Sequence, residues 1–192
     1  MEIFNNIIDF ITNLTLTLGP LFGIFLIILE SIIPALPLAV FIALNIVVFG
    51  DFLGFIISWF ATVLGCLLSY YLVKKGFSDK LYKHIKEDGK ISLFLKNTKK
   101  LSFPNLVLLM AMPFTPAFAV NIAAGLSKMN FKKFLLALLI SKPFMIYFWG
   151  YVGKTLIESI KDPWVLFRIA IILLIAYLVS QLIQIKFKIK EE

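Results

Sequence analysis

The chain is poor in residues that bind metals or form covalent cross-links. It has a single cysteine, Cys66, and a single histidine, His84, among 192 residues. A lone cysteine cannot close an internal disulfide, and structural zinc sites need about four cysteine or histidine ligands. We therefore expect Cys66 to be a packing residue in its apolar run. The sequence also lacks GxSxG, Walker-type and GxGxxG motifs, so we expect neither enzymatic activity nor a cofactor.

Charged residues are also scarce, at 16% of the chain, whereas 60% of the residues are hydrophobic and 20 are phenylalanine. Ordinary globular domains are about 45–50% apolar. A chain with a mean hydropathy of +0.95 cannot hide so much apolar surface from water. The composition therefore predicts one all-α integral membrane domain over residues 1–192, without a soluble domain.

The net charge of +8 is concentrated in polar segments. Residues 74–100 hold nine lysines against three acidic residues, and this loop is either an interfacial amphipathic segment or a solvated connection. Anionic lipid headgroups are a nearer partner for this charge than nucleic acid. The excess of lysine predicts a cytoplasmic loop in a multi-pass plasma-membrane protein, with both termini cytoplasmic.

Long uncharged runs predict the transmembrane elements, because a spanning helix needs about 20 apolar residues. We expect about four transmembrane helices, the first kinked or delayed at Gly19-Pro20 and the third interrupted at Lys142-Pro143. Two proline-broken runs are instead expected to be re-entrant hairpins. The expected helices are 10–29, 52–73, 134–153 and 164–185, and the expected hairpins are 32–49 and 102–127.

The two broken runs share a pattern of prolines. Pro34 and Pro37 in the first run correspond to Pro113 and Pro116 in the second, 79 residues later, and a glycine follows in each run, Gly125 in the second. The expected topology brings the hairpins in from opposite sides of the membrane. Paired interruptions of this kind indicate an inverted repeat with a site near the membrane midplane. Chance is the alternative, because PxxP is a short pattern.

A few polar residues within the apolar runs are candidates for function. Glu30 and Asp51 are candidate proton or gating groups, and both could instead be interfacial helix ends. Lys142 could face a cavity, pair with Glu30 and attract a headgroup phosphate, or it could extend to the interface. Asn121 and Thr115 could contact a headgroup or cap the hairpin. The tyrosines at positions 70, 71, 147 and 151 are expected in an aromatic belt.

These residues resemble those of the DedA superfamily, and more closely its VTT-domain (SNARE-associated Golgi protein) branch. The resemblance covers roughly residues 20–155, and these motifs carry it: Glu30…Pro34-x-x-Pro37…Gly50…Gly54, Pro113-Phe-Thr-Pro116…Asn121-x-x-x-Gly125 and Phe134…Pro143…Tyr151-x-Gly153. It implies two opposed re-entrant hairpins and lipid translocation. Bacterial members are linked to flipping undecaprenyl phosphate or phosphatidylethanolamine, eukaryotic relatives to phospholipid scrambling, and some members to the proton gradient.

The sequence also departs from the family pattern. Met110 stands where the family often has an arginine, and the first hairpin lacks the aspartate of the DedA branch, although Glu30 matches the family's acidic position. These departures weigh against undecaprenyl-phosphate binding through those charges, and Lys142 could replace the missing cation.

Three functions follow from the sequence. The first is lipid translocation between leaflets, of a phospholipid or a polyprenyl phosphate. The alternatives are a proton- or cation-coupled transporter of a small solute and a non-transporting membrane assembly factor. The partners would be membrane lipids, and the sequence is compatible with a homo-oligomer.

Overall fold

The structure is a computed structural model that describes residues 10, 13–14, 16–33, 37–77, 101–115, 117–159 and 162–189, and all of its regular elements in these ranges are helical. By length and composition, three described helices can cross a membrane, at Asp51–Lys75, Phe131–Leu156 and Pro163–Ile183. The elements are α2 (Pro20–Ile32), α3 (Leu38–Phe49), α4 (Asp51–Leu72), the π-helix η1 (Val73–Phe77), α7 (Phe103–Ala111), α8 (Ala117–Leu126), α9 (Phe131–Ser159) and α10 (Pro163–Ile189).

Helix α2 begins later than the apolar run that contains it. Gly19 has a φ of +68°, a left-handed conformation that suits glycine, and Pro20 occupies the first turn, where its missing N–H group costs nothing. The delay expected at Gly19-Pro20 is therefore present. As a result, α2 has 13 residues and is too short to span.

The first hairpin is formed by α2 and α3, and it begins earlier in the chain than the expected range of 32–49. Ile33, which precedes a proline in the sequence, has extended backbone angles and ends α2. Pro37 is the N-cap of α3. The break is therefore where the prolines predict it. However, the first helix of the hairpin, α2, which we call its ascending arm, lies in the run that was expected to form a separate transmembrane helix.

The second hairpin repeats this arrangement. Helix α7 ends at Ala111, and Met112 is extended before Pro113. Helix α8 begins at Ala117, directly after the second proline of the pair. In each hairpin five residues separate the two helices in the sequence, 33–37 and 112–116. A long helix follows each hairpin, α4 after the first and α9 after the second.

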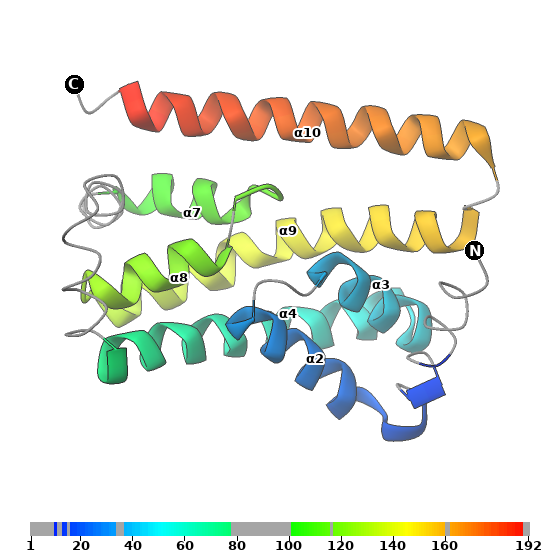
Figure 1. The fold of residues 1–192 in the computed structure, drawn as a ribbon, viewed down its shortest axis with the longest axis horizontal. Coiled ribbons are helices and arrows are strands. Elements are labelled where there is room, and N and C mark those ends of the chain that lie inside the picture. The colour runs from blue at the N-terminus through cyan, green and yellow to red at the C-terminus, as the bar shows by residue number, and fades with distance from the viewer. Residues whose placement is uncertain are drawn as a thin grey trace.

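The two hairpins enter the molecule from opposite ends, as expected for an inverted repeat. In Figure 1, α2 and α3 extend from the right towards the middle, whereas α7 and α8 extend from the left. Both hairpins reach to near the middle of the long axis, whereas α4 and α9 run along most of its length. Helix α2 of the first hairpin contacts α8 of the second.

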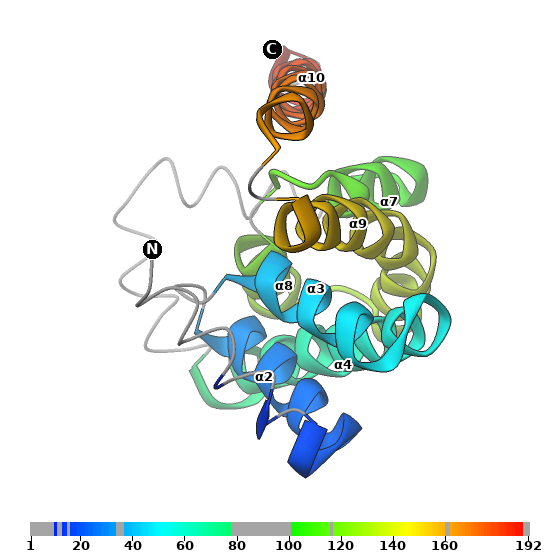
Figure 2. The same cartoon turned by 90° about the vertical axis from the view of Figure 1, so that its right-hand side faces the viewer.

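The described apolar core has two large clusters, one around each hairpin, and a small third one of Ala123 and Leu126 on α8. The first-hairpin cluster joins α2 and α3 to the first half of α4 and the second half of α9 through residues such as Ile27, Ile42 and Ile146. The second-hairpin cluster joins α7 and α8 to the other halves of α4 and α9 through residues such as Tyr70, Leu106 and Leu138. Figure 2, viewed from the end, shows α4 and α9 between the arms of the hairpins.

Two further helices differ from the simplest expectation. Helix α9 is continuous from Phe131 to Ser159 and contains Pro143 in its interior, so the expected interruption at Lys142-Pro143 is absent. Helix α10 packs against α9 and lies at the periphery in both ribbon views. Only 11% of its spanning window is buried, so α10 presents most of its surface outward.

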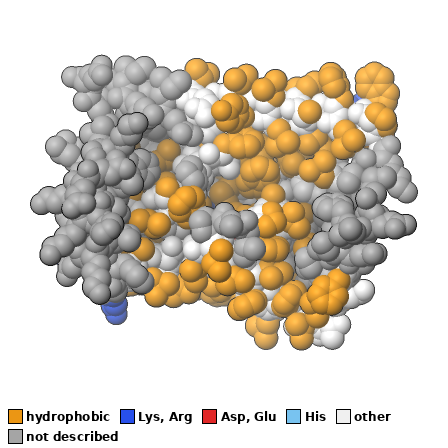
Figure 3. Space-filling model, in the orientation of Figure 1, with side chains coloured by type: hydrophobic (Ala, Val, Ile, Leu, Met, Phe, Trp, Pro, Cys, Tyr) orange, Lys and Arg blue, Asp and Glu red, His pale blue; other side chains and the backbone are white. Residues whose placement is uncertain are grey.

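Hydrophobic side chains cover most of the described surface. Figure 3 shows them across the visible face, over the middle of the molecule. An apolar surface of this extent fits contact with lipid tails rather than water. Pro34, Pro116, His84 and most of the expected amphipathic loop at 74–100 lie outside the described residues, apart from 74–77 in η1.

Candidate functional site

Polar side chains lie between the two large apolar clusters along α4 and α9, although Trp59 packs against both clusters. On α4, Thr62 lies between Ala61 of the first-hairpin cluster and Val63 of the second-hairpin cluster. On α9, the two clusters reach Leu138 and Ile146, which are eight residues and about 12 Å apart along the helix. The polar layer, as we name it, consists of Glu30, Ser31, Thr62, Thr115, Asn121, Ser141 and Lys142.

Lys142 is the charged residue at the centre of this layer. Its side chain has 0% exposure, and its amine is 3.7 Å from the Sδ atom of Met145. A thioether is a weak acceptor, so this contact replaces little of the hydration that a buried ammonium loses. Lys142 thus faces the interior of the helix bundle and does not extend to an interface.

Glu30 lies in the last turn of α2 and is half-buried. It interacts electrostatically with Lys142 of α9, although the two side chains form no direct ion pair within the described structure. The fold therefore brings together the carboxylate and the amine that sequence reasoning considered as a pair. Their attraction links the end of the first hairpin's ascending arm to the middle of α9.

Three further polar groups of the layer are buried without hydrogen-bond partners. Asn121 is fully buried on α8, and neither its Nδ2 nor its Oδ1 atom has a partner. The hydroxyl groups of Thr115, in the second break, and Ser141, beside Lys142, are unpartnered as well. Each such group costs about 1–3 kcal/mol of stability. Buried polar groups are normally paired, so each of these unpaired groups is a candidate contact for a polar ligand or water.

A second pair of polar residues joins the first hairpin to α4 and was not singled out for function from the sequence. Asn45 of α3 donates a hydrogen bond from Nδ2 to Ser58 Oγ of α4 at 3.1 Å. Gly23 and Gly54 face Asn45, and a Cβ atom at either glycine would collide with it. These contacts fix how closely α2, α3 and α4 cross.

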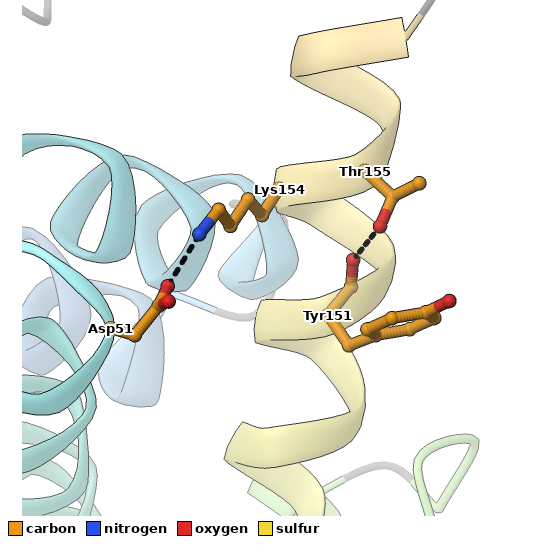
Figure 4. Close-up of polar contacts among 4 residues, drawn as sticks. All are labelled: Asp51, Tyr151, Lys154 and Thr155. Atoms are coloured by element: carbon orange, nitrogen blue, oxygen red, sulfur yellow. Dashed lines mark hydrogen bonds and ion pairs between the residues drawn. The ribbon is translucent and has the colours of Figure 1, made fainter.

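Asp51 lies away from the polar layer. It is the first residue of α4, eleven residues and about 16 Å along the helix from Thr62. Its carboxylate forms an ion pair with the amine of Lys154 at 2.6 Å, and the two side chains are 75% and 33% exposed, respectively (Figure 4). The structure therefore does not bring Asp51 and Glu30 together.

The hairpin-shaping residues have separate structural roles. Pro37 caps α3, and Pro113 begins the turn of the second break. Gly125 lies where α8 crosses α4, because a Cβ atom there would come within 2.8 Å of the Tyr70 carbonyl oxygen. Next in sequence to Pro113, Phe114 packs its ring against Phe148 and Trp149 of α9.

Tyr70 and Met110 both belong to the second-hairpin cluster, and the structure shows what each of them contacts. Tyr70 is fully buried rather than part of an aromatic belt, and its hydroxyl donates to the Met129 carbonyl at 2.7 Å. It thereby fastens α4 to the connection between α8 and α9, whereas Tyr71, Tyr147 and Tyr151 are exposed as expected. Met110 is 3% exposed and belongs to the second-hairpin cluster, so this position contributes packing and no charge.

No group of three or more histidine, cysteine, aspartate or glutamate residues in the described ranges could hold a metal ion. Of the residues that form the polar layer, Ser31, Thr62 and Ser141 were missed from the sequence. Serine and threonine are ordinary in apolar helices, and only the fold places these three at the boundary between the clusters.

An all-helical membrane protein with two opposed, proline-broken hairpins is thus the class that the fold defines. The VTT domain model matches residues 33–155, and this chain belongs to that family, the VTT-domain branch of the DedA superfamily. The match begins at the first break and ends near the end of α9.

Two curated relatives extend this assignment. The chain is 34% identical over 145 residues to "Uncharacterized membrane protein YhjE" of Bacillus subtilis (strain 168), covering 76% of this chain and 70% of the relative. It is 30% identical over 122 residues to "Uncharacterized protein YqeD" of the same organism, covering 64% of this chain and 59% of that relative. No solved structure matches the chain.

Proposed function

We propose that this protein moves lipids between the leaflets of a bilayer, with the headgroup crossing along the polar layer while the acyl chains stay in the hydrocarbon. The observation that carries the proposal is the fully buried amine of Lys142, at the level where two opposed hairpins break. A charged side chain at membrane depth is costly, and such residues usually line a substrate or ion path.

The chemistry of the layer suits a lipid phosphate. Lys142 offers an ammonium group, and Asn121, Thr115 and Ser141 offer hydrogen-bonding groups that have no partner within the protein. These groups can replace part of the water that a phosphate loses when it leaves the membrane surface. Phospholipids and polyprenyl phosphates share this phosphate, so both remain within the proposal.

Glu30 would regulate the occupancy of Lys142. In the empty protein its carboxylate lowers the cost of the buried ammonium by Coulombic attraction. A phosphate that reaches Lys142 would compete with this carboxylate. Protonation of Glu30 would remove the competition, which provides a route for coupling to a proton gradient.

The proposed orientation follows from lysine placement. Lys128, Lys132 and Lys133 lie at the end of the molecule where the second hairpin enters, and we assign this end to the cytoplasm of a plasma-membrane protein. Helix α10 would then return the chain to the cytoplasmic side. The cytoplasmic N-terminus stays a prediction, because residues 1–9 lie outside the described ranges.

Liposome transport tests the proposal. The purified protein is reconstituted with a fluorescent phospholipid in both leaflets, and dithionite is added outside. In protein-free vesicles only outer-leaflet fluorescence is lost, whereas proteoliposomes should lose more because inner-leaflet lipid reaches the outside. The assay is then repeated with a fluorescent polyprenyl phosphate. If both probes lose the same fraction of fluorescence with and without protein, lipid translocation is refuted and an assembly factor is favoured.

Lys142→Met connects transport to the buried amine. We expect transport to slow by roughly tenfold or more, because a hydrogen bond to a charged group is worth about 1.5–3 kcal/mol. The fold should persist, since replacing a buried charge by an apolar side chain is often neutral or stabilising. Lys132→Met, an exposed lysine on the same helix, is the matched control and should transport normally.

A proton-coupled solute transporter is the second candidate, and the Glu30–Lys142 interaction is the observation that favours it. Glu30→Gln tests the proton coupling that this candidate requires. If the carboxylate couples protons to any transport, the variant loses the pH dependence of transport. If lipid still crosses at the same rate with the same pH dependence, Glu30 has no coupling role.

A further inference from the structure

A cleft of 690 Å³ opens at the end of the molecule opposite to the entrance of the second hairpin. Its walls come from the end of α3, the first turns of α4 and the last turns of α9. These elements belong to different halves of the repeat. The cleft is separate from the polar layer, since Asp51 at its rim lies about 16 Å along α4 from Thr62.

Four of the nine residues that line the cleft are aromatic, and three of these four are exposed. Phe52, Tyr147 and Tyr151 line it and are 82%, 71% and 54% exposed. Large apolar rings so exposed are stable in a membrane, where they contact lipid, and tyrosine favours the level of the headgroups. Gly150 deepens the cleft, because a side chain there would meet Ile46 of α3.

The rim carries one cation and one anion from opposite walls. Lys154 of α9 donates to the Asp51 carboxylate of α4 at 2.6 Å, as Figure 4 shows. Thr155, the next residue, donates its hydroxyl hydrogen to the Tyr151 carbonyl and so has only acceptor capacity left for a ligand. An anion entering the cleft would therefore be bound through Lys154.

The ion pair is suited to exchange. Both side chains are partly exposed, and exposed ion pairs contribute little stability, so a competing anion can replace Asp51 at little cost. A phosphate is a strong competitor because its bonds to lysine are charge-assisted. The exposed aromatic residues of the cleft favour a phosphate that is attached to acyl chains over a free ion.

We propose that this cleft docks the phosphate of a bilayer lipid, and that the Asp51–Lys154 pair is a latch that the phosphate opens by taking Lys154. The proposal rests on the proposed function, since the docked lipid is one that waits to enter the path between the hairpins. With the latch closed, α4 and α9 are tied together at this end. With the latch open, their ends are free to separate beside the first hairpin.

Photo-crosslinking tests the docking site. The full chain is placed in liposomes containing a phospholipid with a diazirine in its acyl chain, and cross-linked peptides are mapped by mass spectrometry. We expect labelling of peptides that contain Phe52 and Tyr151. A diacylglycerol with the same diazirine chain but no phosphate should label these peptides about tenfold less, as expected for loss of a charge-assisted contact.

Variants of the two rim residues test the latch. Lys154→Gln should reduce cleft labelling about tenfold, whereas Lys154→Arg should retain it. Asp51→Asn breaks the same ion pair but removes the carboxylate that competes with the phosphate for Lys154, so labelling should rise severalfold. Lys132→Gln removes an exposed charge from the same helix and should leave labelling unchanged.

The opposite signs distinguish a latch from a structural bond. If the ion pair only holds the fold together, Asp51→Asn and Lys154→Gln will change labelling in the same direction, and the proposal is overturned. Equal labelling by the phospholipid and the diacylglycerol would also overturn it. If the cleft is labelled in a Lys154-dependent way but the dithionite assay shows no transport, only the transport function is refuted. If the dithionite assay shows transport but the cleft is not labelled, only the docking site is refuted.

Discussion

Lys142 and Asn121 show how single residues within this fold depart from what stability alone would select. Each is fully buried, and neither has a hydrogen-bond partner that offsets its desolvation well. An apolar residue at either position would pack with less cost. A buried polar group that lowers stability can still be useful if it binds a polar substrate. At Asn121, the effect of a substitution on stability can be compared with its effect on transport.

Replacing Asn121 by leucine should raise stability and lower transport. The amide is unpaired on both atoms, so its removal should gain about 1 kcal/mol or more, equivalent to roughly 2–4 °C in melting temperature for a chain of this size. Lipid transport should fall because a hydrogen-bonding group is lost from the polar layer. Thermal unfolding in detergent and the dithionite assay measure the two effects.

Asn130 is the matched control for this variant. Its Oδ1 atom accepts hydrogen bonds from the backbone N–H groups of Lys132 and Lys133 and caps α9. Asn130→Ala should therefore lower stability by about 1 kcal/mol. If Asn121→Leu also lowers stability, its amide has a structural role, and the assignment of Asn121 to a substrate path would be wrong.

At the scale of the elements, glycines determine how closely the first hairpin packs on α4. A Cβ atom at Gly54 would collide with the backbone of Asn45 and Ile46, and backbone atoms cannot yield as a flexible side chain can. Gly54→Val should therefore push α3 away from α4 and cost roughly 1–3 kcal/mol. A drop in melting temperature measures this cost.

Ala170→Val provides the comparison for Gly54→Val. Ala170 is exposed on α10, so an added branched side chain meets no packed neighbour, and the melting temperature should stay nearly constant. An unchanged melting temperature for Gly54→Val would show that α3 and α4 lie farther apart than this structure has them.

The element boundaries explain which parts of the fold were predictable. Pro34 and Pro113 each impose an extended residue before them, so both breaks could be located from the sequence. The ascending arm of the first hairpin could not, because hydropathy does not distinguish a spanning helix from a re-entrant arm. Pro143 gave a false interruption, since packing on both sides of α9 keeps that helix continuous.

The candidate site was predictable where a charge, or a polar residue close to the second proline pair such as Thr115 or Asn121, marked it. Glu30 and Lys142 stand out as ionisable groups in apolar runs, and for this reason sequence reasoning considered them as a pair. Ser141 carries no such signal, because a serine in an apolar helix is usually unremarkable. The Asp51–Lys154 pair joins residues 103 positions apart, so only the folded chain shows it.

At the scale of the whole molecule, each of the two large apolar clusters stabilises a different part of the same helix bundle. Each cluster closes around one hairpin, and α4 and α9 belong to both. Among the described residues, the polar layer holds three of the side chains with unpaired buried polar atoms, Thr115, Asn121 and Ser141, and the others are Asn45 and Trp59. Separation at the boundary between the clusters would open a polar path without unfolding either cluster, which is what passage of a headgroup between the leaflets requires.

This arrangement depends on hairpins that enter from opposite sides of the membrane, which cysteine labelling can test. Leu18 lies just before the first hairpin, and Asn130 lies just after the second; both are exposed. In a Cys66→Ala background, Leu18→Cys and Asn130→Cys should react with a membrane-impermeant maleimide from opposite sides. Cys66 is buried, so its removal should alter the labelling background and not the fold.

Asp162→Cys fixes which side is which. Asp162 is exposed between α9 and α10, and Figure 1 places that connection at the end where the first hairpin enters. It should react from the same side as Leu18→Cys, and on intact cells both should react from outside if the lysine-rich end is cytoplasmic. Reaction of Leu18→Cys and Asn130→Cys from one side would mean that the hairpin breaks do not face each other. The polar layer would then provide no continuous path, and lipid translocation by this route would be excluded.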